Sequence, residues 1–174
     1  MKRTILIGIS LWMLVPFLLA NSIIKPKDIT GWNNLNWGMT TAEVQNILGK
    51  EVQERDQKND YKDDMYSSLQ LRNILIGQNK FRASLWMDIK TKKLVRIVFV
   101  PEGQPTKYEW AETFINLEKY LVEKYGDPDL EKTSNDLGTS AERIWKFYST
   151  EIELNYLKIQ ENELLLLVFS QKKH

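Results

Sequence analysis

The stretch "NLNWGMTTAEVQNILGKE", residues 34–51, specifies where a short helix begins and where it ends. Thr40 is a favoured N-cap residue, and Glu43 three positions later completes a capping box. Gly49 is placed to end the helix in a left-handed conformation. One apolar face is predicted, formed by Val44, Ile47 and Leu48. A helix of about two turns is unstable alone, so local signals of about 1 kcal/mol each decide whether it forms.

The same signals recur in residues 105–128, "PTKYEWAETFINLEKYLVEKYGDP". Thr106 and Glu109 form a second capping box, and Gly126 followed by Pro128 ends the predicted helix. Its apolar stripe consists of Trp110, Phe114, Leu117, Leu121 and Tyr125. The chain therefore contains two helices with the same start and stop signals.

Three strand-like segments separated by short turns follow each helix. They are residues 67–77, 80–90 and 93–100 after the first helix, and residues 142–149, 151–160 and 163–171 after the second. In residues 80–90, Phe81 and Leu85 alternate with polar neighbours, which is typical of a half-buried strand. We interpret the chain as two αβββ units, residues 23–101 and 102–174, that together form one compact domain.

Short links between the strands predict antiparallel pairing, and the apolar face of each unit needs a cover. We therefore predict an α+β fold of two layers, with the helices on one face of the sheet. One six-stranded sheet and two adjoining three-stranded sheets are both compatible with the pattern. The run "LLLLV", residues 164–168, predicts a central strand that is covered on both sides.

The N-terminus has the features of a secretory signal peptide over residues 1–22. Lys2 and Arg3 precede an apolar run at residues 5–19, and small residues stand before a cleavage site after Ser22. We expect export to the periplasm or the exterior; an uncleaved membrane anchor is the alternative, because the apolar segment approaches the length of a span. The chain has no cysteine, so neither disulfides nor a lipid-modified cysteine can form.

The composition limits the classes of partner. Hydrophobic residues make up 43% of the chain, which supports a folded core. The 24 basic and 23 acidic residues nearly cancel, so the sequence has no basic footprint for nucleic acid.

Two motifs, one around each predicted helix, resemble motifs of a group of exported bacterial proteins of unknown function. "NWGMTTAEVQNILG" is similar to their WGM-S/T-x-x-E-V-x-x-x-L-G opening, and "LVEKYGDP" to their L-x-x-K-Y-G-x-P helix end. The predicted duplication also resembles, in topology alone, the beta-lactamase inhibitory protein fold, and a single unit resembles small outer-membrane assembly lipoproteins. This chain departs from both by lacking cysteine. The resemblance implies an envelope location and a binding fold.

Catalytic chemistry has few candidates in this sequence. The single histidine is the terminal His174, and without cysteine neither a Cys–His pair nor a cysteine-based zinc site can form. Four aspartates at residues 56–64 lack the spacing of a calcium loop and are interpreted as a solvated connection. Asp88 and Glu153 could form a carboxylate pair for acid–base work, but each occupies an ordinary polar strand position. We predict no enzyme activity, no catalytic residue, no metal and no cofactor.

Binding residues are predicted on the polar face of the sheet and in the polar connection. Trp86 lies on the polar side of its strand together with Arg82 and Asp88, and an aromatic residue there can anchor an interface. The tyrosines of the polar connection, Tyr61 and Tyr66, are candidates by the same logic. The predicted function is binding of an envelope protein partner. The alternative is a small ligand in a cleft between the two units, lined by Phe114, Tyr125 and Phe147.

Overall fold

The computed structural model describes residues 25–61, 64–103, 109–136 and 138–173, and only the backbone of 55–61, 68 and 109. The predicted signal peptide, residues 1–22, and the predicted cap Thr106 lie outside the described residues. Within the described ranges, no helix has the length and apolar character needed to cross a membrane.

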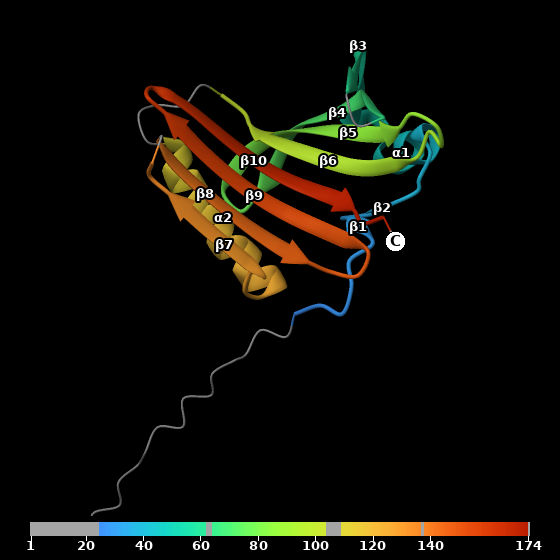
Figure 1. The fold of residues 1–174 in the computed structure, drawn as a ribbon. Helices are drawn as coiled ribbons and strands as arrows, with labels where there is room; N and C mark the ends of the chain where they lie inside the picture. Colours follow the sequence, from blue (N-terminus) through green and yellow to red (C-terminus); the bar gives the residue numbers. More distant parts are fainter. Residues whose placement is uncertain (1–24, 62–63, 104–108, 137, 174) are drawn as a thin grey trace, which may run out of the picture.

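The structure consists mainly of antiparallel sheet, with two α-helices (Figure 1). A small hairpin precedes the first helix and is formed by β1 (Gly31–Trp32) and β2 (Leu35–Asn36). The first half continues with α1 (Thr41–Leu48), a 3₁₀ turn (Gly49–Glu51), β3 (Val52–Tyr61), β4 (Met65–Ile76), β5 (Asn79–Asp88) and β6 (Leu94–Pro101). The second half contains α2 (Glu109–Tyr125), β7 (Leu130–Ser134), β8 (Thr139–Lys146), β9 (Thr150–Ile159) and β10 (Asn162–Gln171).

The predicted signals of α1 are confirmed. Glu43 donates its backbone N–H to Oγ1 of Thr40 at 3.3 Å, and its Oε2 accepts the Thr40 backbone N–H at 2.7 Å. Val44 is fully buried, and Gly49 ends the helix with a φ of 54°. Gly126 likewise follows α2 with a φ of 80°. Local capping chemistry therefore sets these helix ends, as the sequence indicates.

One sheet of eight strands replaces the six strands that the sequence predicts. Its order is β3-β4-β5-β6-β10-β9-β8-β7, with antiparallel pairing throughout. The two strands missed are β3 and β7, the outermost strands on either side. Their sequences, "VQERDQKNDY" and "LEKTS", are charged and lack an apolar alternation, because an edge strand can be hydrophilic and needs no buried face. The segment interpreted as a solvated connection is therefore largely strand β3.

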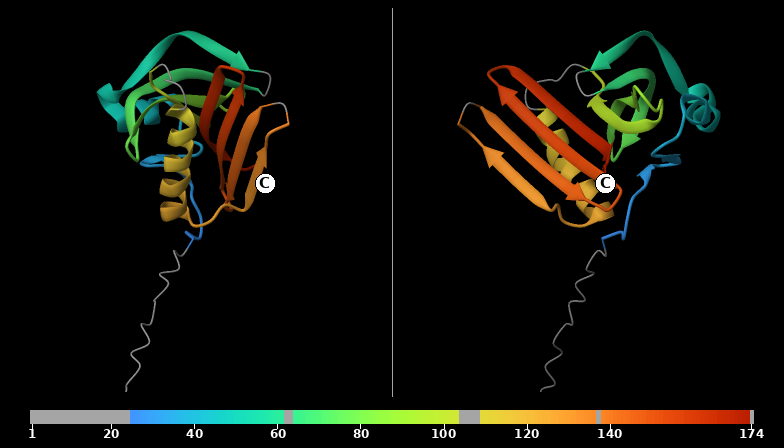
Figure 2. Two further views of the ribbon diagram at one scale, coloured as in Figure 1. Left: turned by 90° about the vertical axis from the view of Figure 1, so that its left-hand side faces the viewer. Right: turned by 45° about the vertical axis from the view of Figure 1, so that its right-hand side comes forward.

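Helix α2 covers β9 and β10. Phe114 of α2 packs on Tyr156 of β9 with ring centroids 6.0 Å apart, and Tyr125 meets Phe169 of β10 at 6.3 Å. In Figures 1 and 2, α2 runs along one side of strands β7–β10, whereas no described helix or strand lies on their other side. These contacts belong to one buried cluster that draws side chains from both halves of the chain.

The first half is covered by smaller pieces of structure. Trp32 of the β1–β2 hairpin packs on Phe99 of β6 with ring centroids 4.9 Å apart. Helix α1 lies beside the turn between β5 and β6, where Leu94 donates its backbone N–H to the Met39 carbonyl at 2.7 Å (Figure 1).

Candidate functional site

The register of the sheet separates a covered face from an open one, because directly opposed residues of neighbouring strands share a face. One row crosses five strands and is almost completely buried: Trp145, Ile152, Phe169, Ile97 and Leu85. The adjacent rows point the other way and are half-buried: Ile144, Glu153, Val168, Val98 and Ser84, and then Glu151, Ser170, Arg96 and Trp86. We call this second side the open face; it also includes Leu157, Leu164 and Leu166.

Apolar side chains run along the open face from the β9–β10 turn to the two central strands. Leu157 of β9 and Leu164 of β10 are directly opposed and are 37% and 45% exposed. Val98, Leu166 and Val168 are half-buried on the two central strands. The "LLLLV" strand is therefore central, as predicted, but the prediction that both its sides are covered is wrong. Its run of leucines supplies a buried face to the core and an accessible face to the outside.

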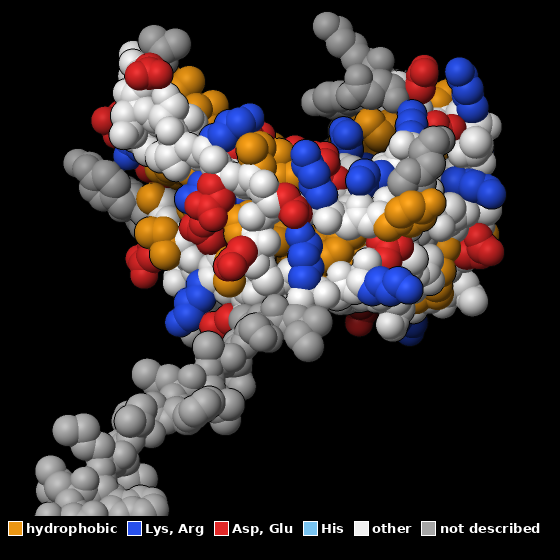
Figure 3. Space-filling model, turned by 60° about the horizontal axis from the view of Figure 1, so that its bottom comes forward, with side chains coloured by type: hydrophobic (Ala, Val, Ile, Leu, Met, Phe, Trp, Pro, Cys, Tyr) orange, Lys and Arg blue, Asp and Glu red, His pale blue; other side chains and the backbone are white. Residues whose placement is uncertain are grey.

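Charged groups of opposite sign lie on either side of these apolar residues. Glu142, Glu151 and Glu153 stand on β8 and β9, whereas Arg82 and Arg96 stand on β5 and β6. Figure 3, which brings the lower side of Figure 1 forward, shows hydrophobic side chains exposed between acidic and basic ones. Such a surface offers a partner both apolar area and a defined pattern of charge.

Glu153 lies on the open face, opposite Ile144 of β8 and Val168 of β10. Burial raises the pKa of its carboxyl, the nearby Glu151 raises this pKa further, and Arg96 opposes the shift. Arg96 itself donates from Nε to the Ser170 hydroxyl at 3.1 Å. The open face is therefore partly shielded from water on the neighbouring strands β9, β10 and β6.

Three predicted binding residues, Arg82, Trp86 and Asp88, lie on the open-face side of β5. Asp88 shares a small hollow with Arg96 and Ser170. Trp86 is half-buried and is paired with Arg96, whereas Arg82 is exposed and paired with Val100. The structure thus brings Trp86 beside a basic residue at the β5–β6 side of the face. An indole next to a guanidinium group is a combination that is frequent in protein interfaces.

Asp88 has a local structural task. Its Oδ1 accepts hydrogen bonds from the backbone N–H of Thr91 at 2.7 Å and of Lys90 at 3.0 Å. The Thr91 hydroxyl adds a third bond at 3.0 Å. The bonds from Thr91 lower the pKa of Asp88. The side chain predicted as a binding residue is therefore engaged in shaping the turn between β5 and β6.

The two tyrosines predicted as contacts are not both available. Tyr66 lies in strand β4, is 9% exposed, and has the ammonium group of Lys92 5.0 Å from its ring centroid. The prediction that Tyr66 lies in a polar connection is wrong, because it belongs to strand β4 and its ring joins the buried core. The backbone of Tyr61 belongs to β3, but its side chain lies outside the described part of the structure.

The structure also shows where the residues of the expected cleft and of the possible carboxylate pair lie. Phe114, Tyr125 and Phe147 are buried, and the rings of the last two lie 5.9 Å apart in the core. Tyr125 also borders a small hollow of about 50 Å³ between the two halves, which Trp32 and Leu75 line from the first half. Asp88 on β5 and Glu153 on β9 are separated by β6 and β10, three strand spacings of about 5 Å each. This distance is too large for the two carboxyl groups to share a proton.

Among the described residues, no group of three or more acidic, histidine or cysteine side chains is placed to hold a metal ion.

Sequence reasoning missed most of the apolar residues of the open face. Their signal was present, because "IVFV" at residues 97–100 and "LLLLV" at residues 164–168 are apolar at successive positions. Such runs predict apolar side chains on both faces of a strand, but they do not show whether the second face is covered.

Comparisons with known proteins add nothing to this geometry. No protein-family model matches the sequence, and searches of curated proteins and of solved structures gave no match.

Proposed function

We propose that this protein is an exported, non-enzymatic binding module of the bacterial envelope, and that it engages a protein partner through the open face and the adjoining loops. The observation that carries the proposal is the accessible apolar side of the two central strands, bordered by Glu151 and Glu153 on one side and Arg96 on the other. An apolar patch with a charged rim is typical of protein interaction surfaces.

We also infer that the two halves are copies of one unit, with the helices on one face of the sheet. The symmetric strand order supports this, since β6 and β10, the last strand of each half, meet in the centre. Each unit then comprises a helix and four strands rather than the three strands that the sequence predicts. An alignment of related sequences tests the inference: the two halves should match position by position, and an alignment without such an internal match contradicts it.

Export rests on the N-terminal sequence. Residues 1–22 combine a basic start, an apolar run and small residues at the cleavage site. N-terminal sequencing of the protein from its own cells should give a chain that begins at residue 23. An intact chain in the membrane fraction identifies the anchored alternative, and an intact chain in the cytoplasm contradicts export.

The partner is tested by crosslinking the tagged protein in its own cells and identifying captured proteins by mass spectrometry. Replacing both Leu157 and Leu164 by serine removes exposed apolar area without opening the core. We expect one envelope protein to be captured repeatedly by the wild type, and its affinity to fall by at least about fivefold in the double variant.

The matched control is Ile115→Ser on α2, which is 63% exposed and lies away from the open face. It should capture the partner like the wild type. Equal capture by the wild type, the double variant and the control contradicts the use of the open face.

A further inference from the structure

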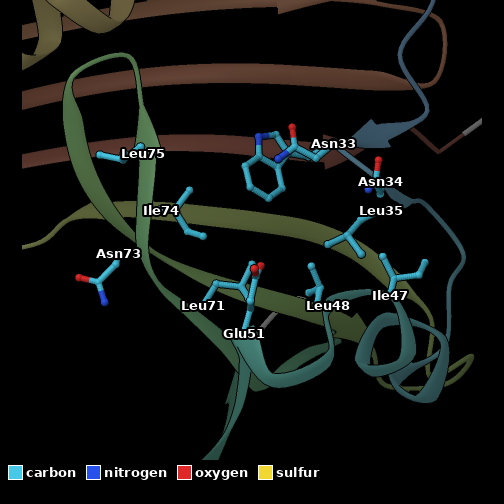
Figure 4. Close-up of a pocket in the computed structure, with 11 residues that line it drawn as sticks. Asn33, Asn34, Leu35, Ile47, Leu48, Glu51, Leu71, Asn73, Ile74 and Leu75 are labelled. Carbon is cyan, nitrogen blue, oxygen red and sulfur yellow. The ribbon is translucent and has the colours of Figure 1, made fainter.

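A groove in the first half of the molecule lies away from the open face. It is bounded by α1, by the β1–β2 hairpin and by the far end of β4 (Figure 4). Its volume is about 480 Å³, within the range of about 300–1,000 Å³ that is common for small-molecule sites. Seven of its eleven lining residues are apolar, but Leu35 and Leu71 are almost fully buried, so polar and apolar groups contribute comparably to its accessible wall.

The groove exists because α1 is short. The helix ends at Leu48, and the turn at Gly49–Glu51 leads the chain into β3, so no further helical turn covers the sheet there. Ile47 and Leu75, which also line the groove, are 40% and 66% exposed. A ligand that covers them would remove apolar surface from water, which favours binding.

The charge of the groove is simple. Among the described residues that line it, Glu51 alone carries a charge. Figure 4 shows the Glu51 side chain directed from its turn into the groove, in the region of Leu71 and Leu48. The remaining polar groups are neutral amides, those of Asn33, Asn34 and Asn73. Glu51 is exposed to solvent, and a carboxylate on the wall of the groove attracts a cation and disfavours an anion.

We propose that this groove binds a small amphiphile with an apolar chain and a single ammonium group. The ammonium group pairs with the Glu51 carboxylate, and the apolar chain lies against Ile74, Leu75 and the Trp32 indole. The carboxylate sets the sign of the ligand's charge, and the exposed leucine and isoleucine side chains set its apolar character.

Calorimetric titration with octylamine, octanol and octanoate tests the proposal at neutral pH and low salt, on the protein in the form purified from its own cells. The three probes share one chain and differ in charge. Octylamine should bind most tightly and octanoate most weakly. In Glu51→Gln the affinity for octylamine should fall by about threefold to tenfold, toward that of octanol, because a partly exposed ion pair is lost.

Two further variants sharpen the result. Glu123→Gln removes an exposed carboxylate of α2 that does not line the groove, and it should leave all three affinities unchanged. Ile47→Lys places a cation on the rim and should weaken octylamine more than octanol. Absence of octylamine binding overturns the proposal, as does equal binding of the three probes or an unchanged octylamine affinity in Glu51→Gln. The open-face double variant Leu157→Ser/Leu164→Ser should bind octylamine normally, so the two sites can fail independently.

Discussion

The two halves of the molecule differ in how their share of the sheet is covered. In the second half, the 17-residue helix α2 buries Phe114, Leu117, Leu121 and Tyr125. In the first half, the 8-residue helix α1 has only Val44 fully buried. Helices with similar start and stop signals in the sequence therefore differ in how much apolar surface they bury, and the larger of the two hollows beside them adjoins the shorter helix.

The first half compensates with contacts from the N-terminal segment to the second half. Asp28 accepts hydrogen bonds from the backbone N–H and the hydroxyl of Ser149, at 2.8 and 2.6 Å. Lys25 forms an ion pair with Asp129 at 2.5 Å. Polar contacts therefore tie the N-terminal segment of the first half to the second half, in addition to the apolar packing of Trp32 on Phe99.

The largest expected effect is that of Trp145→Ala in the second half. Trp145 is fully buried, and its indole N–H donates to the Gly126 carbonyl at 2.7 Å, directly after α2. Its loss should lower the free energy of unfolding by about 3–5 kcal/mol, measured by urea denaturation. The half-buried Trp86→Ala in the first half is the comparison and should cost clearly less. Equal losses would show that the two halves are sealed equally well.

Thr150→Val should have the next largest effect, because it breaks the connection between the halves. The buried Thr150 hydroxyl accepts from the Trp37 indole N–H at 2.7 Å and donates to the Ile29 carbonyl. Valine has the same shape but leaves both partners without this bond, at a cost of about 1–3 kcal/mol. Thr150→Ser keeps the hydroxyl and should retain most of the stability. If valine and serine have equal effects in the same denaturation experiment, the hydrogen bonds contribute little.

Thr40→Ala should destabilise the protein by about 1 kcal/mol, since it removes the capping box of α1. Thr40→Ser preserves the hydroxyl and serves as the control. Amide hydrogen exchange should show faster exchange in α1, with α2 unchanged, because α2 is held by its buried face. Increased exchange in both helices would contradict this separation.

The smallest expected effect concerns pH. The pKa of Glu153 is raised in the folded state, so folding is penalised once the unfolded chain ionises there. Glu153→Gln should therefore be more stable than the wild type at neutral pH, by no more than about 1 kcal/mol after solvent screening. The gain should vanish below the ordinary glutamate pKa of about 4.3, where both states of the wild type are protonated.

For two carboxylates of the first half, the dependence of stability on pH should have the opposite sign. Hydrogen bonds from Thr40 and Thr91 lower the pKa values of Glu43 and Asp88, respectively, so their contribution is present near neutral pH and is lost as the pH falls through those values. Thermal unfolding of wild type and Glu153→Gln across this pH range checks both directions. A stability difference that is constant with pH would contradict the assignment for Glu153.

Features of this fold whose signals are local could be predicted from the sequence. The capping box at Thr40, the stop at Gly126, the alternation of β5 and the central place of β10 could all be predicted, because neighbouring residues alone set these preferences. The α+β class and the antiparallel pairing followed from the order of the elements and their short turns. Trp86 and Arg82 were placed correctly on the polar side of their strand by the same alternation.

Only the tertiary structure decided which surfaces are covered. An apolar run does not reveal that one side of β10 stays open, and the charged sequences of β3 and β7 do not reveal that they pair at the sheet edges. The burial of Tyr66, the turn held by Asp88 and the groove beside α1 likewise depend on neighbours far away in the chain. The physical reason is that hydrogen-bond geometry acts over a few residues, whereas burial is set by whichever distant segment packs against a given face.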